Sequence, residues 1–309
     1  MTEACAPAKV ILFGEHSVVY GRPALAVPVQ DVQACVQVEP VDRPGVTVCA
    51  MELGCTWELS CAPEEEPLCM TVRNTLSRLQ VDARELALRL TIRSSIPVAS
   101  GLGSGAAVAT ALVRALSAHL GHSLGAEVVS ALVYETEKVF HGTPSGIDNT
   151  VVAYEQAVCF RRGEPIRRLA VARPFWLAIA DSGLPSLTAE SVADVRAAWQ
   201  RDPAGYEALF DEIGAIVERA YSALERGEVA VLGPLMSANQ EVLRRLGVSG
   251  PELEALIEAA LRSGASGAKL SGGGRGGNVI AVVQPEQAEG VRRALLAAGA
   301  THVIVTRVG

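Results

Sequence analysis

The 309-residue sequence is poor in lysine and in aromatic residues, and it contains no long apolar segment. No stretch approaches the roughly 18 consecutive apolar residues that a membrane-spanning helix requires. The N-terminus lacks a basic stretch followed by an apolar run, which excludes a secretory signal peptide. We therefore expect a cytoplasmic protein that has no membrane partner.

The seven cysteines do not form a recognisable metal-binding or disulfide pattern. Their number is odd, and no two of them are separated by only two residues, which argues against a zinc site and against a disulfide framework. Cys49, Cys55 and Cys61 recur at even spacing and are interpreted as buried reduced thiols.

Positive charge is also scarce. The net charge of -7 disfavours a nucleic-acid partner, because affinity for such a polyanion comes from a basic surface. Only three of the 27 basic residues are lysines, namely Lys9, Lys138 and Lys269. In a chain that prefers arginine so strongly, each lysine is a candidate for a specific role, and two of the three lie beside motifs described below.

What the sequence does contain is the pattern of a mixed α+β protein of two domains, residues 1–170 and 171–309. The first half predicts strands at 9–13, at 24–29 and on to about 59, a helix at 68–79, a strand at 86–94, and helices up to 121 and at 126–140. The second half predicts a strand at 175–181, long amphipathic helices, and a strand, glycine turn, strand, helix and strand over 268–308.

A glycine-rich segment, Ile96 to Ala107, lies between a predicted strand and a predicted helix. Such a turn lets backbone N–H groups approach phosphate oxygens, and the helix N-terminus adds partial positive charge. Gly101, Gly103 and Ala106 also fit a dinucleotide-binding fingerprint, but that fold requires a strand after the helix, and another helix is predicted here. A Walker A loop is excluded because no Gly-Lys pair occurs. The segment is interpreted as a nucleotide-phosphate loop of another fold, with a turn that binds no ligand as the alternative.

Two carboxylates follow this segment. Glu137, near the C-terminal end of its predicted helix, forms with the Ser104 hydroxyl a suitable oxygen pair for Mg²⁺; a solvated helix residue is the alternative, and Glu135 is its rival. Asp148 ends a glycine-bordered loop, and Lys9 is the natural cation for it. Asp148 and Lys9 are therefore candidates to accept a substrate proton and to offset charge on a transferred phosphoryl group, whereas a helix cap is the alternative for Asp148.

A second glycine cluster, Ser271 to Gly277, separates two predicted strands. So many glycines between strands indicate a close approach of the backbone to another group. A flexible hairpin is the alternative.

In this order, the segments resemble the motifs of the GHMP kinases, and the resemblance covers nearly the whole chain. Ala6 to Gly21 is similar to the first motif, Ile96 to Ala107 to the second, and Lys269 to Gly277 to the third. His141 to Asn149 resembles the substrate loop, and residues 181–196 resemble the segment that closes over mevalonate. Each motif is moderately specific, whereas five in the same order are strongly so.

The resemblance implies a fold and an activity. The fold has an N-terminal domain of the ribosomal-S5-domain-2-like type, with a left-handed β-α-β crossover, and a C-terminal ferredoxin-like domain. The activity is the ATP-dependent phosphorylation of mevalonate in isoprenoid biosynthesis, with Mg²⁺ as a cofactor and with mevalonate and ATP as the small-molecule partners. A homodimer is left open.

The resemblance also implies residue roles. Lys9 and Asp148 would be the catalytic pair, and both would contact the substrate together with Glu15, His16 and Thr188. Ser104 and Glu137 would hold Mg²⁺. The ATP phosphates would lie against residues of both glycine-rich segments: Pro97, Ser100, Gly101, Leu102, Gly103, Ser104, Gly105, Ala106, Gly273 and Gly274. Whether Asp148 takes the proton or Lys9 stabilises the alkoxide stays open.

The sequence departs from the motifs of the family at a few positions. Gly105 stands where a second serine is usual, so Ser104 or water must replace that serine if it is the metal ligand. Arg275 interrupts the third glycine run, either as an added phosphate contact or as a solvent-facing side chain. Asn278 stands at a position that is usually small or cysteine.

Two other functions stay open. One is a related kinase that acts on phosphomevalonate, homoserine or a sugar, and the other is a catalytically silent nucleotide-binding module. The stretch from Gly14 to Tyr20 favours mevalonate, because a sugar kinase would carry a Thr-Asp pair after the histidine.

Overall fold

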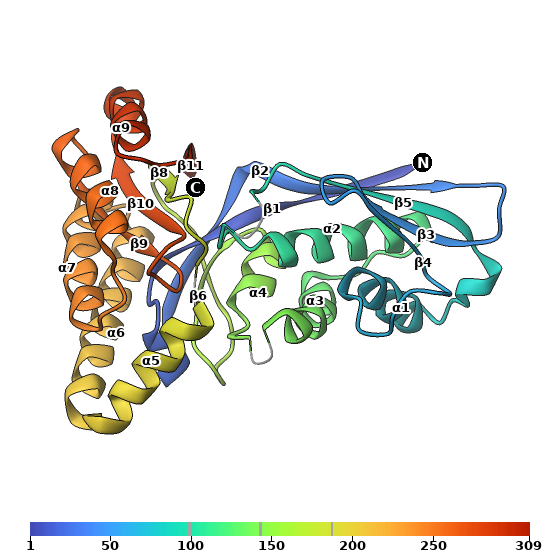
Figure 1. Ribbon diagram of the computed structural model, residues 1–309, viewed down its shortest axis with the longest axis horizontal. Helices are drawn as coiled ribbons and strands as arrows, with labels where there is room; N and C mark the ends of the chain where they lie inside the picture. The colour runs from blue at the N-terminus through green and yellow to red at the C-terminus, as the bar shows by residue number, and fades with distance from the viewer. Residues whose placement is uncertain (98–99, 142–143, 187) are drawn as a thin grey trace. The chain divides into compact units, whose positions relative to one another are not determined.

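The computed structural model describes residues 1–97, 100–141, 144–186 and 188–309 (Figure 1). Val98 and Ala99 of the phosphate loop, Gly142 and Thr143 of the substrate loop, and Leu187 of the closing segment lie outside the described residues. The chain forms two compact units. The first contains residues 1–9, 32–98 and 102–155, and the second contains residues 10–31, 99–101 and 156–309.

The first unit is built on a sheet of alternating inward and outward side chains. Its strands are β3 (Gly45–Ala50), β4 (Cys55–Glu58), β5 (Ala87–Ser94) and the second part of β2 (Ala24–Pro40), with which β1 (Thr2–Phe13) pairs. β3 runs parallel to β5, whereas β4 is antiparallel to β3 and β2 is antiparallel to β5. Along β5, Leu88, Leu90 and Ile92 are buried and Arg89 and Arg93 are exposed, because successive strand side chains point to opposite faces.

Four helices cover the inner face of this sheet (Figure 1). They are α1 (Pro67–Leu79), α2 (Ser104–His119), α3 (Ala126–His141) and α4 (Ile147–Tyr154), and a 3₁₀ turn, η2 (Ala83–Glu85), precedes β5. α2 is the central helix, since it contacts the other three helices and β5. Half of its buried side chains are alanines, whose small size lets the surrounding helices approach closely.

The second unit contains an antiparallel sheet in the order β11-β8-β10-β9. Its strands are β8 (Phe175–Asp181), β9 (Gly267–Ser271), β10 (Asn278–Val283) and β11 (His302–Val308). The helices α7 (Leu232–Arg245), α8 (Pro251–Arg262) and α9 (Pro285–Ala297) pack on this sheet. The order of strands and helices is that of a ferredoxin-like domain, which confirms the prediction for the C-terminal half.

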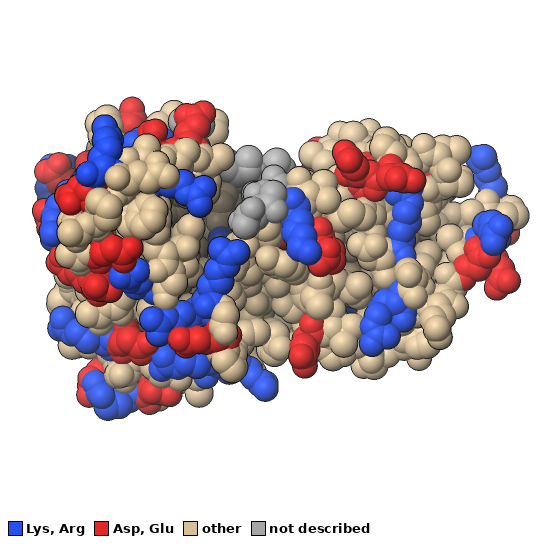
Figure 2. Space-filling model, turned by 90° about the horizontal axis from the view of Figure 1, so that it is seen from below, with Lys and Arg blue, Asp and Glu red and all other residues tan. Residues whose placement is uncertain are grey.

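Further elements complete the second unit. They are the 3₁₀ turn η1 (Ser17–Tyr20), the hairpin of β6 (Ala157–Phe160) and β7 (Arg167–Leu169), the helices α5 (Thr188–Arg201) and α6 (Pro203–Arg226), and the 3₁₀ turn η3 (Val229–Val231). β6 pairs with the first residues of β2, and α6 packs against both α5 and α7. None of the helices in the described part of the chain is long and apolar enough to cross a membrane. On the face shown in Figure 2, acidic and basic side chains are interspersed.

Two predictions about cysteine are wrong. Cys5 and Cys35 form a disulfide, because the pairing of β1 with β2 brings their Cα atoms to 4.0 Å. The remaining five thiols are free, but Cys49 and Cys55 are only half-buried and Cys61 is exposed. The strands of Cys49 and Cys55 have one outward face, which helices do not cover.

Candidate active site

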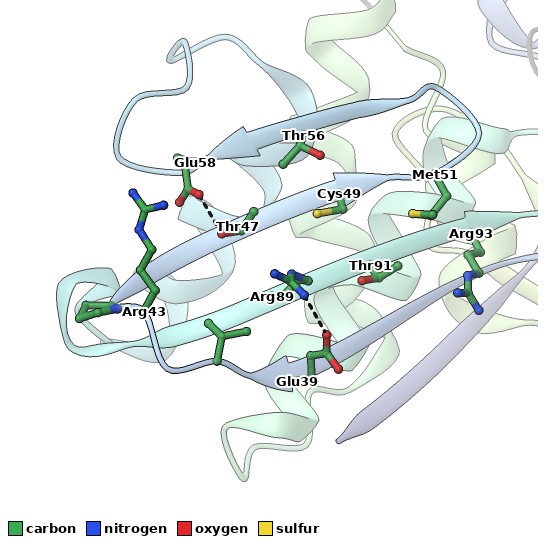
Figure 3. A pocket seen from close by; sticks show the side chains of 12 residues that line it. Glu39, Arg43, Thr47, Cys49, Met51, Thr56, Glu58, Arg89, Thr91 and Arg93 are labelled. Atoms are coloured by element: carbon green, nitrogen blue, oxygen red, sulfur yellow. Dashed lines mark hydrogen bonds and ion pairs between the residues drawn. The ribbon is translucent and has the colours of Figure 1, made fainter.

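An open groove of about 590 Å³ lies on the outer face of the first unit's sheet (Figure 3). Outward side chains of β2 to β5, among them Arg89 and Arg93, line it together with Arg43 of the loop between β2 and β3. Thr47 donates a hydrogen bond to Glu58, and Arg89 pairs with Glu39 across it. No residue predicted for the active site lines this groove. The predicted site residues are therefore described below for each unit by itself.

In the first unit, the structure brings the predicted catalytic pair together. Lys9 lies in β1 and Asp148 in the first turn of α4, and the Lys9 Nζ is 3.0 Å from the Asp148 Oδ1. The two side chains are 6% and 27% exposed. A buried ammonium group requires an opposite charge or hydrogen-bond acceptors, and Asp148 supplies that charge for Lys9.

Gly103 holds this lysine beside the start of α2. It adopts a left-handed conformation with φ of +72°, and a Cβ at this position would lie 2.7 Å from Lys9 Cγ. The Lys9 N–H donates to the carbonyl of Leu102 at 2.9 Å. A side chain at residue 103 would therefore displace Lys9, which gives a physical reason for glycine here.

The N-terminus of α2 has the properties of an anion site. Ser104 is the first residue of α2, as predicted. Gly103 is the N-cap residue, and no side chain caps the N–H groups of the first turn. The first turn holds no acidic residue. Because first-turn N–H groups lack acceptors within a helix and carry the positive end of the helix dipole, they attract phosphate oxygens.

Glu137 is the buried carboxylate of α3. It is 3% exposed, whereas its rival Glu135 is exposed and pairs with Lys138 at 2.7 Å. Burial raises the pKa of Glu137 to about 7, and the charge of Asp148 acts in the same direction, whereas Lys9 opposes it. Lys9, Asp148 and Glu137 thus form one electrostatic cluster in the first unit.

The second unit holds Glu15 and His16, and both contact the third motif. The Glu15 carboxylate forms an ion pair with the Lys269 ammonium group, and these side chains are 1% and 0% exposed. Burial lowers the pKa of Lys269, and Glu15 opposes this effect. The Lys269 Nζ also donates to the carbonyl of Leu270 at 2.5 Å. Sequence reasoning missed Lys269 as part of the site, although the scarcity of lysine had singled it out.

His16 and Thr188 meet at Gly273. The His16 Nε2 lies 3.0 Å from the Gly273 carbonyl, to which it donates. A Cβ on Gly273 would lie 2.5 Å from Thr188 Oγ1, so the first residue of α5 packs directly on this glycine. Thr188 Oγ1 also hydrogen-bonds to the Ser186 hydroxyl at 2.9 Å. The predicted substrate contacts of the second unit are therefore neighbours.

The predicted nucleotide contacts fall in both units. Pro97 and Leu102 to Ala106 belong to the first unit, and Ser100, Gly101, Gly273 and Gly274 belong to the second. Asn278 donates from its side-chain amide to the carbonyl of Ser100. A Cβ on Gly274 would lie 2.2 Å from the carbonyl oxygen of Val248. Gly273, Gly274 and Gly276 thus lie where other protein segments approach closely, as the number of glycines between these strands predicted, whereas a Cβ on Gly272 would meet nothing within 4 Å.

The buried His16 makes stability depend on pH. Burial lowers its pKa from 6.5 to about 4, and the charges of Arg275 and Lys269 contribute. The unfolded state therefore binds more protons between pH 6.5 and 4, so stability is complete above pH 6.5 and is lost as the pH falls toward 4. The loss attributable to His16 is on the order of 3 kcal/mol.

We expect His16→Gln, which keeps a donor for Gly273, to flatten this part of the stability profile. Thermal unfolding of both proteins at pH 7, 6, 5 and 4 measures the difference, with the exposed His302→Gln as the control. An equal decline in all three proteins would contradict the assignment to His16.

Comparison with known proteins agrees with this fold and these motifs. The family model described as the GHMP kinases N-terminal domain matches residues 70–156, and that of the GHMP kinases C-terminal domain matches residues 202–301. The mevalonate kinase of Pyrococcus furiosus is 35% identical over 97% of this chain and 94% of its own length. That of Thermococcus gammatolerans is also 35% identical, with the same coverage.

A solved structure shows the same likeness. The mevalonate kinase of L. major, in complex with R-mevalonate, superposes with a TM-score of 0.86 at 30% identity, over 100% of this chain and 96% of that one. The two-domain fold defines a small-molecule kinase of a known class. The chain belongs to the GHMP kinase family, whose members use ATP as the phosphate donor.

Proposed function

We propose that the protein transfers the γ-phosphoryl group of ATP to the 5-hydroxyl of mevalonate, a step of isoprenoid biosynthesis in the cytoplasm. The observation that carries this proposal is the Lys9–Asp148 pair, held at 3.0 Å beside the glycine turn that opens α2. The mevalonate kinases that match at 35% identity over nearly the full length support mevalonate as the substrate.

In this mechanism the hydroxyl oxygen of mevalonate attacks the γ-phosphorus while the bond from that phosphorus to ADP breaks. Asp148 accepts the hydroxyl proton, and the Lys9 ammonium group stabilises negative charge on the oxygen and on the phosphoryl group. The N–H groups at the start of α2 bind phosphate oxygens. Catalysis then comes from positioning and from charge that is fixed before the reaction.

The donor set of the first unit suits Mg²⁺. Glu137 and the Ser104 hydroxyl would hold the ion, which would neutralise phosphate charge when bound. The fit rests on Glu137, since its burial and the nearby Asp148 disfavour the carboxylate and raise its pKa to about 7. A divalent cation would compensate for both effects.

Besides Lys9 and Asp148 of the first unit, the proposed substrate contacts are Glu15, His16 and Thr188 of the second unit. His16 and Thr188 both contact Gly273, and Glu15 directly precedes His16 in the segment after β1. Their hydrogen-bonding groups suit the carboxylate and hydroxyl groups of mevalonate. We include a homodimer as the proposed assembly, which light scattering of the purified protein tests.

A substrate panel tests the function. ADP release is measured with ATP, Mg²⁺ and either mevalonate, phosphomevalonate, homoserine or galactose, and the product is identified by ³¹P NMR. We expect mevalonate to give a kcat/KM at least about 100-fold above that of the others, since a site built for one set of polar groups leaves them unpaired with another. Faster turnover of another alcohol would make this a related kinase. ATP binding without turnover of any alcohol would make it a silent nucleotide-binding module.

A further inference from the structure

Arg275 is an unusual residue in the third motif. It stands among the glycines of Ser271 to Gly277 and has a left-handed backbone conformation with φ of +56°. Glycine adopts this conformation without the steric cost that a Cβ adds. The side chain of Arg275 must therefore offer a compensating interaction.

The guanidinium group connects three segments of the second unit. Its Nη1 donates to the carboxylate of Asp194 in α5, and its Nη2 donates to the carbonyl of Gly247, after α7, at 3.2 Å. The backbone N–H of Arg275 donates to the neighbouring carbonyl of Val248 at 2.9 Å. Since its donors face protein acceptors, the structure does not favour a phosphate contact.

Among the described residues, few other contacts anchor the N-terminal end of α5, the helix that Arg275 contacts. Within α5 only Ser191 and Val195 are buried. The C-terminal end is fixed separately, because Trp199 donates from its ring nitrogen to Glu207 of α6 at 2.9 Å. Asp194 lies about midway in sequence between Trp199 and Thr188, the first residue of the helix.

The same glycine loop contacts α5 twice. Gly273 packs on Thr188, and two residues later Arg275 pairs with Asp194. The ion pair between Arg275 and Asp194 therefore restrains α5 close to the point where Thr188 packs on the loop.

We propose that Arg275 is a positioning residue, which through Asp194 holds the N-terminal end of α5 on the glycine loop and so places Thr188 for substrate binding. This inference rests on the proposed function, in which Thr188 contacts mevalonate. Arg275 and Asp194 are 36% and 59% exposed, so their pair contributes little to global stability. Its effect is local, because few other contacts hold this end of the helix.

The test uses Arg275→Gly, which removes the guanidinium group and leaves glycine at a left-handed position. We expect KM for mevalonate to rise about fivefold, equivalent to about 1 kcal/mol, while kcat and KM for ATP change less than twofold. Asp194→Asn should also raise KM, and the double variant should raise it no further than Arg275→Gly alone, because both changes break the same ion pair. The control is Glu212→Gln, which removes an exposed ion pair of similar accessibility with Arg245 and should leave KM unchanged.

Amide hydrogen exchange in the ligand-free protein tests the Arg275–Asp194 contact independently of catalysis. Amides of residues 188–198 should exchange about fivefold faster in Arg275→Gly and in Asp194→Asn than in the wild type. Unchanged exchange, or an additive rise of KM in the double variant, would overturn the proposal. If the wild type does not phosphorylate mevalonate, the proposed function fails, and the exchange experiment still decides whether Arg275 holds α5.

Discussion

Replacing Asp148 with asparagine is expected to lower kcat for mevalonate by about 100-fold or more while KM for ATP stays within a few-fold of the wild type. Asparagine has nearly the same shape, but it neither accepts the substrate proton nor carries the charge that faces Lys9 at 3.0 Å. ATP affinity is expected to persist because the N-terminus of α2 and its glycine turn are unchanged. Steady-state kinetics with single-turnover measurement of the chemical step check this expectation.

Asp148 lies in the first turn of α4, so its charge also interacts with the helix dipole. Glu127→Gln is the control for that effect, because Glu127 is an exposed acidic residue in the first turn of α3. Thermal unfolding should show both variants folded. A kcat within threefold of the wild type for Asp148→Asn would remove Asp148 from the mechanism and leave Lys9 as the group that eases ionisation of the hydroxyl.

Local patterns predicted most of the elements of this fold. The strand predicted at 175–181 is β8, and the predicted order over 268–308 matches β9, β10, α9 and β11. The strands are apolar runs, α9 has helical spacing of its apolar residues, and glycine or proline lies near their ends, so both the spacing and the ends can be read from the sequence. β1 was harder to predict. It begins at Thr2 rather than near Lys9, because residues 2–8 have no apolar strand pattern, include Pro7, and are extended by pairing with β2.

Contacts across long sequence separations were not predictable in the same way. Cys5 and Cys35 form a disulfide because β1 and β2 pair with these residues side by side. The spacing of the cysteines in the sequence does not show this strand register. The same holds for the partners of Lys269 and Arg275. The sequence marked both residues as unusual, one by the scarcity of lysine and one by interrupting a glycine run. Their partners became visible only when the fold brought distant segments together.

Lys269 provides the largest expected effect on stability. Its ammonium group and the Glu15 carboxylate are 0% and 1% exposed, so each charge compensates the other out of contact with water. Lys269→Met removes the cation and leaves Glu15 buried without it. Breaking a buried pair in this way costs about 3–5 kcal/mol, because a carboxylate out of water has lost its compensating charge. For a protein of this size, the midpoint of thermal unfolding should fall by roughly 10 °C.

A double variant distinguishes the loss of the ion pair from a change in side-chain packing. Glu15→Met combined with Lys269→Met replaces both charges with apolar side chains of similar length, and we expect it to unfold at a higher temperature than the single variant, since it keeps no buried carboxylate that has lost the lysine charge. Lys138→Met is the control, because this exposed lysine pairs with Glu135 on the surface and such pairs contribute at most about 1 kcal/mol. If Lys269→Met unfolded at the wild-type temperature, Glu15 would have to be neutral in the folded protein. Calorimetry of all four proteins distinguishes these cases, because a charged Glu15 predicts that the double variant is more stable than Lys269→Met alone.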